Sequence, residues 1–339
     1  MIQPTIFAGP CSGKVVFQVD GDLMPPDGPD CWPPNNNKIR WLVFYKADGM
    51  SLVGAGLVDG RGQKWWDLPC KPHKGINNTT FHGKCDSPVA LCFLRSSNLK
   101  VYGLKFQNSP QFHLRFDGCN NVVVDSITIN SPAQSPNTDG IHMANSNNVE
   151  VYNSVISNGD DCISIGSGSF NVIGSLGQKK TSACVGNVTV RNSVVKHSDN
   201  GVRIKTWQGG QGSASGVIFD GIQMDTVRNP IIIDQYYCLS KPCANLSSAV
   251  NISNVLYSNI NGTYDDRRPP IHLGCSEAVP CTNIALSNVK LLPAQGGRAL
   301  DAFCWNAYGE MRTASVPPIS CLLEGMPRSI PGYKVDSCY

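Results

Sequence analysis

The chain has 339 residues, of which 41% are hydrophobic and 16% are charged, and its formal net charge is +3. It contains no apolar run of about 18 residues, so the sequence predicts no membrane-spanning helix. The Lys and Arg residues form no basic stripe, which argues against nucleic acid as a partner. A small positive charge is compatible with mild attraction to an anionic polymer.

Cysteine is frequent, with 15 residues and no Cys-x-x-Cys pair. This pattern argues against a zinc ribbon and favours disulfides formed in an oxidising compartment, with one thiol left over because the count is odd. We expect local bridges in the carboxy-terminal third, at Cys238–Cys243, Cys275–Cys281 and Cys304–Cys321. Six acceptor sequences for N-glycosylation also point to secretion, at Asn77, Asn78, Asn187, Asn245, Asn251 and Asn261. From its first residues we expect no signal peptide in the sequence as given, and we expect a secreted, extracellular monomer.

A short apolar alternation recurs along the chain after an asparagine or a small residue. Successive anchors are 23, 27, 23, 16, 29, 33 and 34 residues apart, at Asn98, Asn121, Asn148, Asn171, Asn187, Gly216, Ala249 and Asn283. A repeat of about 20–50 residues is typical of a solenoid, whereas the strands of a sandwich recur every 8–12 residues or so. We therefore predict an all-β, right-handed parallel β-helix as a single domain over residues 1–339, with asparagines stacked at its turns.

One step of this repeat is anomalous. Only 16 residues separate Asn171 from Asn187, against at least 23 in every other step. At about 3.3 Å per residue, the difference removes roughly 20 Å of chain. The sequence therefore predicts one shortened coil near residues 171–187.

Charged residues gather between residues 135 and 207, in a chain that is otherwise poor in charge. Asp139 and Asp160 are 21 residues apart, about one coil, so stacking would place them with Asp161 on neighbouring rungs of one face. A single Asp-Gly or Gly-Asp is more often a turn, but three such carboxylates at coil spacing favour chemistry. Paired carboxylates perform glycoside hydrolysis, and the adjacent Arg203 and Lys205 suit an acidic sugar.

Three motifs carry a family resemblance: Ser-Pro-Asn-Thr-Asp-Gly (135–140), Gly-Asp-Asp-Cys (159–162) and Arg-Ile-Lys (203–205). Together they resemble the signature of the polygalacturonases, glycoside hydrolase family 28. The phrases Ile-Gly-Ser-Leu-Gly (173–177) and Ile-Ile-Asp-Gln-Tyr-Tyr-Cys (232–238) resemble its plant branch. The resemblance implies a pectin lyase-like right-handed parallel β-helix. It also implies inverting hydrolysis of α-1,4-galacturonosyl bonds in pectin, in cell wall polysaccharide metabolism, without a cofactor or metal.

The resemblance also implies roles for single residues. Asp160 resembles the general acid, and Asp139 and Asp161 resemble the carboxylates that activate the attacking water. Arg203 and Lys205 resemble the residues that hold a galacturonate carboxylate.

Two further residues resemble substrate-binding positions, and each has a structural alternative. Tyr237 is expected to line the sugar subsite, although a packed tyrosine fits almost equally well. Asn137 is expected to orient Asp139, unless it only closes a turn.

The chain departs from the family in the segment before residue 173. The family has a Gly-His-Gly motif there, preceded by a cysteine that pairs with the one at Cys162. Here Ser169-Phe-Asn-Val172 runs directly into Ile173, so we expect Cys162 to be unpaired. His113 lies about one coil before Asp139, and we favour a packing role for it over a place in the cleft. We also expect an amino-terminal cap that is shorter than in the family.

These departures leave alternatives to an active polygalacturonase. One is a catalytically impaired relative that binds pectin, and another is an incomplete gene model of an active enzyme. A third is a pectate lyase, which would need calcium and a basic catalyst. The Asn-Thr-Asp and Asp-Asp motifs argue against the lyase.

Overall fold

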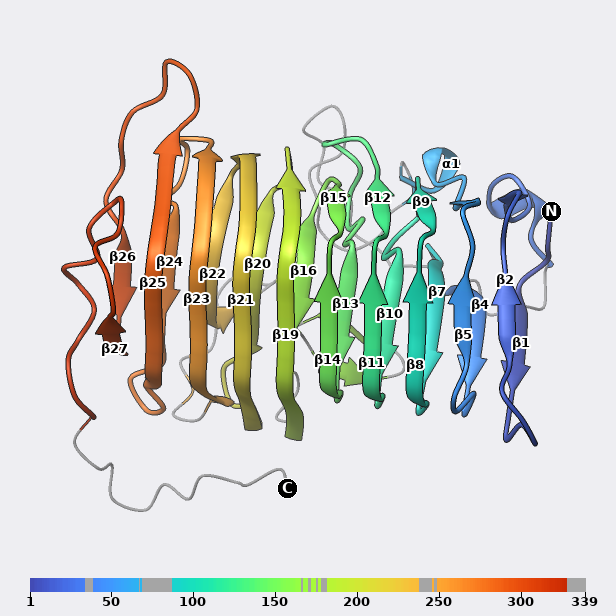
Figure 1. The fold of residues 1–339 in the computed structure, drawn as a ribbon, viewed down its shortest axis with the longest axis horizontal. Helices are drawn as coiled ribbons and strands as arrows, with labels where there is room; N and C mark the ends of the chain where they lie inside the picture. The colour runs from blue at the N-terminus through green and yellow to red at the C-terminus, as the bar shows by residue number, and fades with distance from the viewer. Residues whose placement is uncertain are drawn as a thin grey trace.

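The computed structural model describes residues 1–33, 39–66, 68, 87–165, 167–169, 172–174, 176–177, 182–237, 246 and 249–327. Its strands stack along one axis, with the amino-terminal coil at one end and the last described coils at the other (Figure 1). No helix in this described part of the chain is long and apolar enough to cross a membrane. The predicted parallel β-helix is confirmed, because every strand of the two long sheets pairs in parallel with the coil before or after it.

Sheet 1, as we call the first of these sheets, has one strand per coil. Within the described residues it comprises ten strands, β1 (Thr5–Ala8), β4 (Arg40–Tyr45), β7 (Val89–Leu94), β10 (Leu114–Asp117), β13 (Ile141–Ala144), β16 (Asp161–Ile165), β20 (Asn200–Trp207), β22 (Asn229–Tyr237), β24 (Ile271–Gly274) and β26 (Phe303–Trp305).

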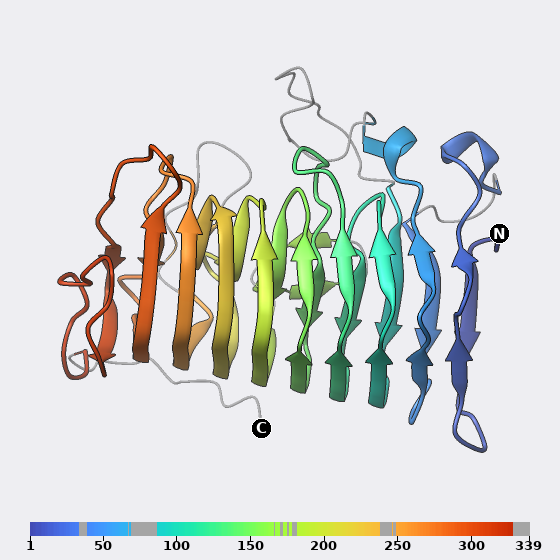
Figure 2. The same cartoon turned by 45° about the horizontal axis from the view of Figure 1, so that its top comes forward.

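Sheet 2 covers the other faces of the solenoid. The early coils contribute two short strands each to it, β2 (Val16–Gln18), β3 (Asp22–Leu23), β5 (Ser51–Val53), β6 (Leu57–Asp59), β8 (Ser97–Tyr102), β9 (Lys105–Gln107), β11 (Asn120–Asp125), β12 (Thr128–Asn130), β14 (Asn147–Tyr152) and β15 (Val155–Ser157). The later coils contribute one long strand each, β19 (Ser182–Lys196), β21 (Gln211–Val227), β23 (Asn251–Tyr264) and β25 (Cys281–Pro293), before the short β27 (Ala307–Met311). Strand β19 pairs with both β14 and β15, so the paired runs continue into one bent strand (Figure 2).

Among the residues that the structure describes, three short elements lie outside the two long sheets. They are the helix α1 (Gln63–Trp66), a 3-10 turn at Pro29–Cys31, and an antiparallel pair formed by β17 (Ser167–Ser169) and β18 (Val172–Gly174).

Stacked asparagines mark the turns of sheet 2, as predicted. Asn121 donates from Nδ2 to Asn98 Oδ1 at 3.1 Å, and Asn148 donates to Asn121 at 3.0 Å. Each of these residues has a φ between 53° and 56°, a left-handed conformation that asparagine tolerates better than most residues. The ladder therefore satisfies side-chain amides along the axis while the backbone turns.

The prediction of a short coil near residues 171–187 is wrong. Strands β14 and β19 pair Asn147 with Gly186 and Val149 with Val188, so the ladder passes from residue 148 directly to residue 187, a step of 39 residues. The chain leaves the coil after β16 and forms the β17–β18 pair before it rejoins sheet 2. Asn171 itself lies outside the described residues. Ala249 is also not a rung, because Asn283 donates to Asn254 at 2.6 Å.

The core consists of like side chains stacked from coil to coil. Phe7, Phe44, Phe93 and Phe116 lie in register, with ring centroids 5.2, 5.1 and 5.0 Å apart. Burying one such side chain contributes about 1.5–3 kcal/mol. This stack ends one rung before β13, so the core continues directly beneath the polar residues described below.

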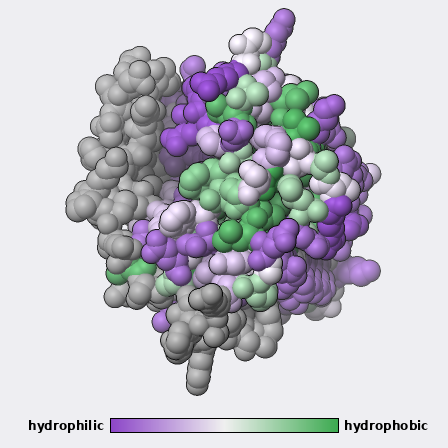
Figure 3. Space-filling model, turned by 90° about the vertical axis from the view of Figure 1, so that its left-hand side faces the viewer, coloured by the Kyte–Doolittle hydropathy of each residue, from purple (hydrophilic) through white to green (hydrophobic). Residues whose placement is uncertain are grey.

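The carboxy-terminal coils hold two of the expected disulfides and an exposed apolar surface. Cys275–Cys281 and Cys304–Cys321 are bonded, whereas Cys238–Cys243 lies outside the described residues. The end that carries β26 and β27 shows hydrophobic side chains at the centre of its described surface (Figure 3). Trp305 is among the exposed side chains of these coils, at 49%. A terminal coil has one neighbour fewer to cover it.

Candidate active site

The outer face of sheet 1 collects polar side chains because residues alternate along each strand. In β20, Val202 and Ile204 are fully buried in the core, while Arg203 and Lys205 point to the other side. The Arg-Ile-Lys motif is therefore a strand alternation that presents two cations on one face. Pairing brings Ser164 beside Arg203 and Asp234 beside Lys205.

The three sequence-predicted carboxylates meet at the start of two neighbouring strands. Ile141 pairs with Ile163, so Asp139 and Asp161 each lie two residues before matched rungs, as the coil spacing predicted. A glycine is required directly after Asp139 and directly before Asp160, where a Cβ on Gly159 would lie 2.0 Å from the carbonyl oxygen of Ser135. A Cβ on Gly140 would lie 2.5 Å from the carbonyl oxygen of Cys162.

Asp161 is fully buried and makes three polar contacts. Its Oδ2 lies 2.6 Å from Lys205 Nζ, and its Oδ1 accepts from Arg203 at 3.1 Å and from Asn200 Nδ2 at 2.7 Å. Burial alone would raise the pKa of Asp161, but the charges of Lys205 and Arg203 outweigh it and hold that pKa well below the usual range. Asp161 is therefore ionised, and its two cations remain charged.

The pKa values of Asp160 and Asp139 are shifted in the opposite direction, upward. Burial, together with the charge of Asp161, raises the pKa of Asp160 to about 7. Burial and the charges of Asp160 and Asp161 also raise the pKa of Asp139 well above its usual range. Carboxyl groups whose pKa values are separated in this way can serve as acid and as base within one site.

Tyr237 lies against the two cations. Its ring centroid is 5.3 Å from the Arg203 guanidinium carbon and 5.5 Å from Lys205 Nζ, and it packs edge-on against Trp207 at 5.5 Å. Burial raises the pKa of the Tyr237 phenol, so the ring stays neutral. These contacts place Tyr237 in the site and leave its role in binding a sugar as a prediction.

Asn137 occupies the turn before Asp139. Its φ of 54° is left-handed, and its Nδ2 is buried with no hydrogen-bond partner among the described residues. The neighbouring Thr138 and Ser135 hydroxyls, 2.7 Å apart, bond to each other and close the turn. The Asn137 amide is thus a spare donor at the edge of the site, and its orienting role stays a prediction.

Two expectations about neighbouring residues are confirmed. His113 is packed: its Nδ1 lies 2.9 Å from the carbonyl oxygen of Asp139, and its Nε2 lies 2.9 Å from Ser131 Oγ. Burial lowers the pKa of His113 to about 4, so it is neutral. Cys162 is a free, buried thiol whose Sγ lies 3.1 Å from Ser198 Oγ.

The sequence reasoning missed three polar residues that contact this site. Asn200 donates to Asp161, Ser164 donates to Asp139 at 2.9 Å, and Asp234 lies 3.8 Å from Arg203. Their signal in the sequence was the polar position inside an apolar strand, as in Ile163-Ser164-Ile165.

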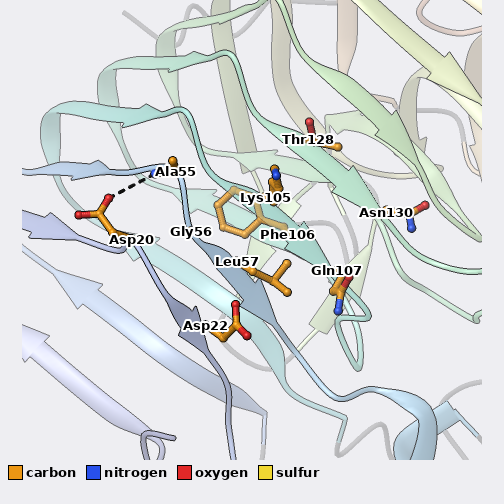
Figure 4. Close-up of a pocket in the computed structure, with 10 residues that line it drawn as sticks. All are labelled: Asp20, Asp22, Ala55, Gly56, Leu57, Lys105, Phe106, Gln107, Thr128 and Asn130. Atoms are coloured by element: carbon orange, nitrogen blue, oxygen red, sulfur yellow. Dashed lines mark hydrogen bonds between the residues drawn. The ribbon is translucent and has the colours of Figure 1, made fainter.

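A separate cavity of about 390 Å³ lies on the outside of sheet 2. Figure 4 shows Asp20 and Asp22 at one side of it and Lys105 and Gln107 at another. None of the carboxylates described above lines it. Nowhere among the described residues do three or more His, Cys, Asp or Glu side chains form a group that could hold a metal ion.

The comparisons with known proteins agree with this geometry. The model of glycosyl hydrolases family 28 matches residues 1–307. The chain belongs to this family. It is 38% identical to polygalacturonase-2 of Solanum lycopersicum, over 91% of this chain and 68% of that protein. It is also 38% identical to a probable polygalacturonase of Arabidopsis thaliana, over 94% of this chain and 73% of that protein.

Solved structures share the fold of this family 28 chain at low sequence identity. An exopolygalacturonase from Thermotoga maritima has a TM-score of 0.61 at 18% identity, with 95% of this chain and 83% of that chain covered. An endo-xylogalacturonan hydrolase from Aspergillus tubingensis has a TM-score of 0.63 at 22% identity, with 90% and 89% covered. At these identities the likeness supports the fold alone. Family membership and the plant relatives identify the chain as a glycoside hydrolase.

Proposed function

We propose that this glycoside hydrolase cleaves the α-1,4-galacturonosyl bonds of pectin with inversion at the anomeric carbon. The observation that carries the proposal is that three adjacent carboxyl groups differ in their pKa values. Asp161 is held ionised by two cations, while Asp160 has a pKa of about 7. An acid and a base are thus present together below neutral pH.

In this proposal Asp160 protonates the leaving glycosidic oxygen. Asp139 and Asp161 activate the attacking water on the opposite side of the sugar, and one of the two accepts its proton. No cofactor is required, because proton transfer and positioning perform the reaction.

The cations explain why the substrate is acidic. Arg203 and Lys205 share Asp161 as their counter-charge, and Arg203 is 14% exposed at its side chain. A galacturonate carboxylate would bring a further negative charge to this pair, with the Tyr237 ring beside it. A methyl-esterified galacturonate lacks that charge, so de-esterified homogalacturonan is the preferred substrate.

Secretion into the cell wall is part of the proposal. Two disulfides are present in the carboxy-terminal coils, and disulfides persist in oxidising compartments. Of the acceptor asparagines that the structure describes, Asn187 and Asn261 are exposed and Asn251 is partly buried. We propose that the enzyme acts there as a monomer.

The test is reducing-end release from polygalacturonate by the native chain and by Asp160→Asn. We expect Asp160→Asn to lose activity by at least about 100-fold, because the leaving oxygen loses its proton donor. Asp220→Asn, which changes a partly exposed carboxylate on sheet 2, is the matched control and should retain full activity.

Two outcomes would contradict the proposal. If the folded native chain binds polygalacturonate without releasing reducing ends, the impaired, pectin-binding alternative is correct. If activity requires calcium and yields unsaturated products, the reaction is a lyase reaction. Family membership and the relatives favour a hydrolase over both.

A further inference from the structure

A hydrogen-bonded network of Ser164 and His142 contacts Asp139, apart from the contacts that the two cations make with Asp161. Ser164 Oγ lies 2.9 Å from Asp139 Oδ2 and 2.7 Å from His142 Nδ1. His142 Nδ1 itself lies 4.0 Å from Asp139 Oδ2. All three residues are at most 2% exposed, so water does not compete for these contacts.

Strand register fixes the spacing of the side chains in this hydrogen-bonded network. His142 and Ser164 are register partners on β13 and β16, and both point to the outer face of sheet 1. The His142 ring is stacked on Phe112, with centroids 4.6 Å apart and an interplanar angle of 24°. The imidazole is thereby held with Nδ1 toward Ser164.

The number of available protons restricts which groups in this network can donate a hydrogen bond. Ser164 has one hydroxyl proton and can donate it to Asp139 or to His142, but not to both. When Asp139 is ionised, Ser164 donates to Asp139, and His142 must then donate from Nδ1 to Ser164. This arrangement gives a partner to the Asp139 carboxylate, the Ser164 hydroxyl and His142 Nδ1, and it requires the tautomer of His142 that carries the proton on Nδ1.

We propose that His142, through Ser164, is a positioning residue that holds Asp139 aimed at the attacking water and favours its ionised form. The inference rests on the proposed function, in which Asp139 is a base. Several groups face Asp139 besides Ser164: Asp160 and Asp161 from the next coil, Lys205 from β20, and His113, which contacts its backbone carbonyl. Burial and the two carboxylates favour a neutral Asp139, and the Ser164 hydroxyl acts with Lys205 against them.

The test compares pH profiles of kcat and KM on polygalacturonate for four single variants and one double variant. Ser164→Ala removes the donor to Asp139. His142→Phe keeps the stack on Phe112 but removes Nδ1, whereas His142→Asn retains a polar atom near the Nδ1 position. Ser146→Ala changes a buried corner serine that bonds the carbonyl of Ala144, and it is the matched control.

We expect Ser164→Ala and His142→Phe to shift the acid limb of the pH profile of kcat to higher pH by about one unit. The reason is that a lost hydrogen bond raises the pKa of a carboxylate. Activity should fall about tenfold at acidic pH and recover as the pH rises, with KM little changed. His142→Asn should lie close to the native profile, and Ser146→Ala should match it. The double variant Ser164→Ala/His142→Phe should be no worse than either single variant, because both act through one chain.

A loss of activity by the same factor at every pH, or no loss, would overturn the proposal. An inactive native chain would instead overturn the proposed function. The positioning role is then still measured by NMR titration of the Asp139 carboxyl carbon, whose pKa must be higher in Ser164→Ala than in the native chain. This titration also serves if His142→Phe fails to fold.

Discussion

Asp161 is the counter-charge of two cations that the fold has removed from water. Its side chain is fully buried, and those of Arg203 and Lys205 are only 14% and 8% exposed. Removing one member of a buried ion pair leaves the other charges uncompensated. Asp161→Asn should therefore destabilise the folded state by on the order of 3 kcal/mol, measured by urea unfolding at pH 6.

The matched control for this prediction is Asp234→Asn. Asp234 lies 3.8 Å from Arg203, but its side chain is 24% exposed, so the loss should stay near or below about 1 kcal/mol. Equal losses in the two variants would mean that Asp161 is not the main counter-charge of the pair.

Residues of the site differed in how well the sequence could predict them. Arg203, Lys205 and the aspartates carry charge in a chain that has little of it, and this contrast alone marked them. Ser164 and Asn200 are ordinary polar residues in or beside strands. They become partners of Asp139 and Asp161 only through register between coils, which no local pattern specifies.

The asparagine ladder gives a test at the scale of one element. Gly216 interrupts the ladder between Asn187 and Asn254, with a φ of 68°. Asn254 bonds to Ser215 Oγ instead, at 3.4 Å. Gly216→Ala should destabilise the protein by roughly 1–2 kcal/mol, because alanine disfavours the left-handed region. Gly216→Asn should be more stable than Gly216→Ala, because asparagine tolerates this region and supplies the missing rung.

Thermal unfolding of the two variants measures the difference. Gly296 provides the control, since its φ is 78° and a Cβ there would meet nothing within 4 Å. Replacing Gly296 with Ala and with Asn measures how much stability is lost when each residue adopts a left-handed backbone conformation outside the asparagine ladder. If the advantage of Asn over Ala is the same at both positions, the ladder itself contributes nothing.

The same ladder shows how far the repeat could be predicted. The first rungs, residues 98, 121 and 148, were assigned correctly, because each coil there passes from strand to strand with short turns. The pattern failed where the chain leaves the coil after β16, since an asparagine before a valine fits a hairpin as well as a rung. Coil length was thus predictable only where no excursion interrupts the stack.

For the whole molecule, Asp160 and Asp161 bias stability in opposite pH directions. The folded-state pKa of Asp160 is raised from 3.8 to about 7, so the folded protein binds this proton more tightly than the unfolded chain does. Its contribution is full below about pH 3.8 and is lost as the pH rises to about 7. The pKa of Asp161 is lowered, so its contribution is present above about pH 3.8 and is lost as the pH falls further.

The two carboxyl groups together predict a stability maximum on the acid side of neutrality. We expect the Tm of the native chain to be highest near about pH 4 and to decline toward pH 7. Asp160→Asn cannot ionise at this position, so it should have the higher Tm at pH 7 and a flatter profile, whereas Asp220→Asn should follow the native chain. A lower Tm of Asp160→Asn at pH 7 would show that the ionised carboxylate stabilises the fold. In the proposed mechanism, the proton whose retention on Asp160 stabilises the folded state is also the proton that Asp160 donates to the leaving oxygen, so stability and the proposed activity favour the same pH range.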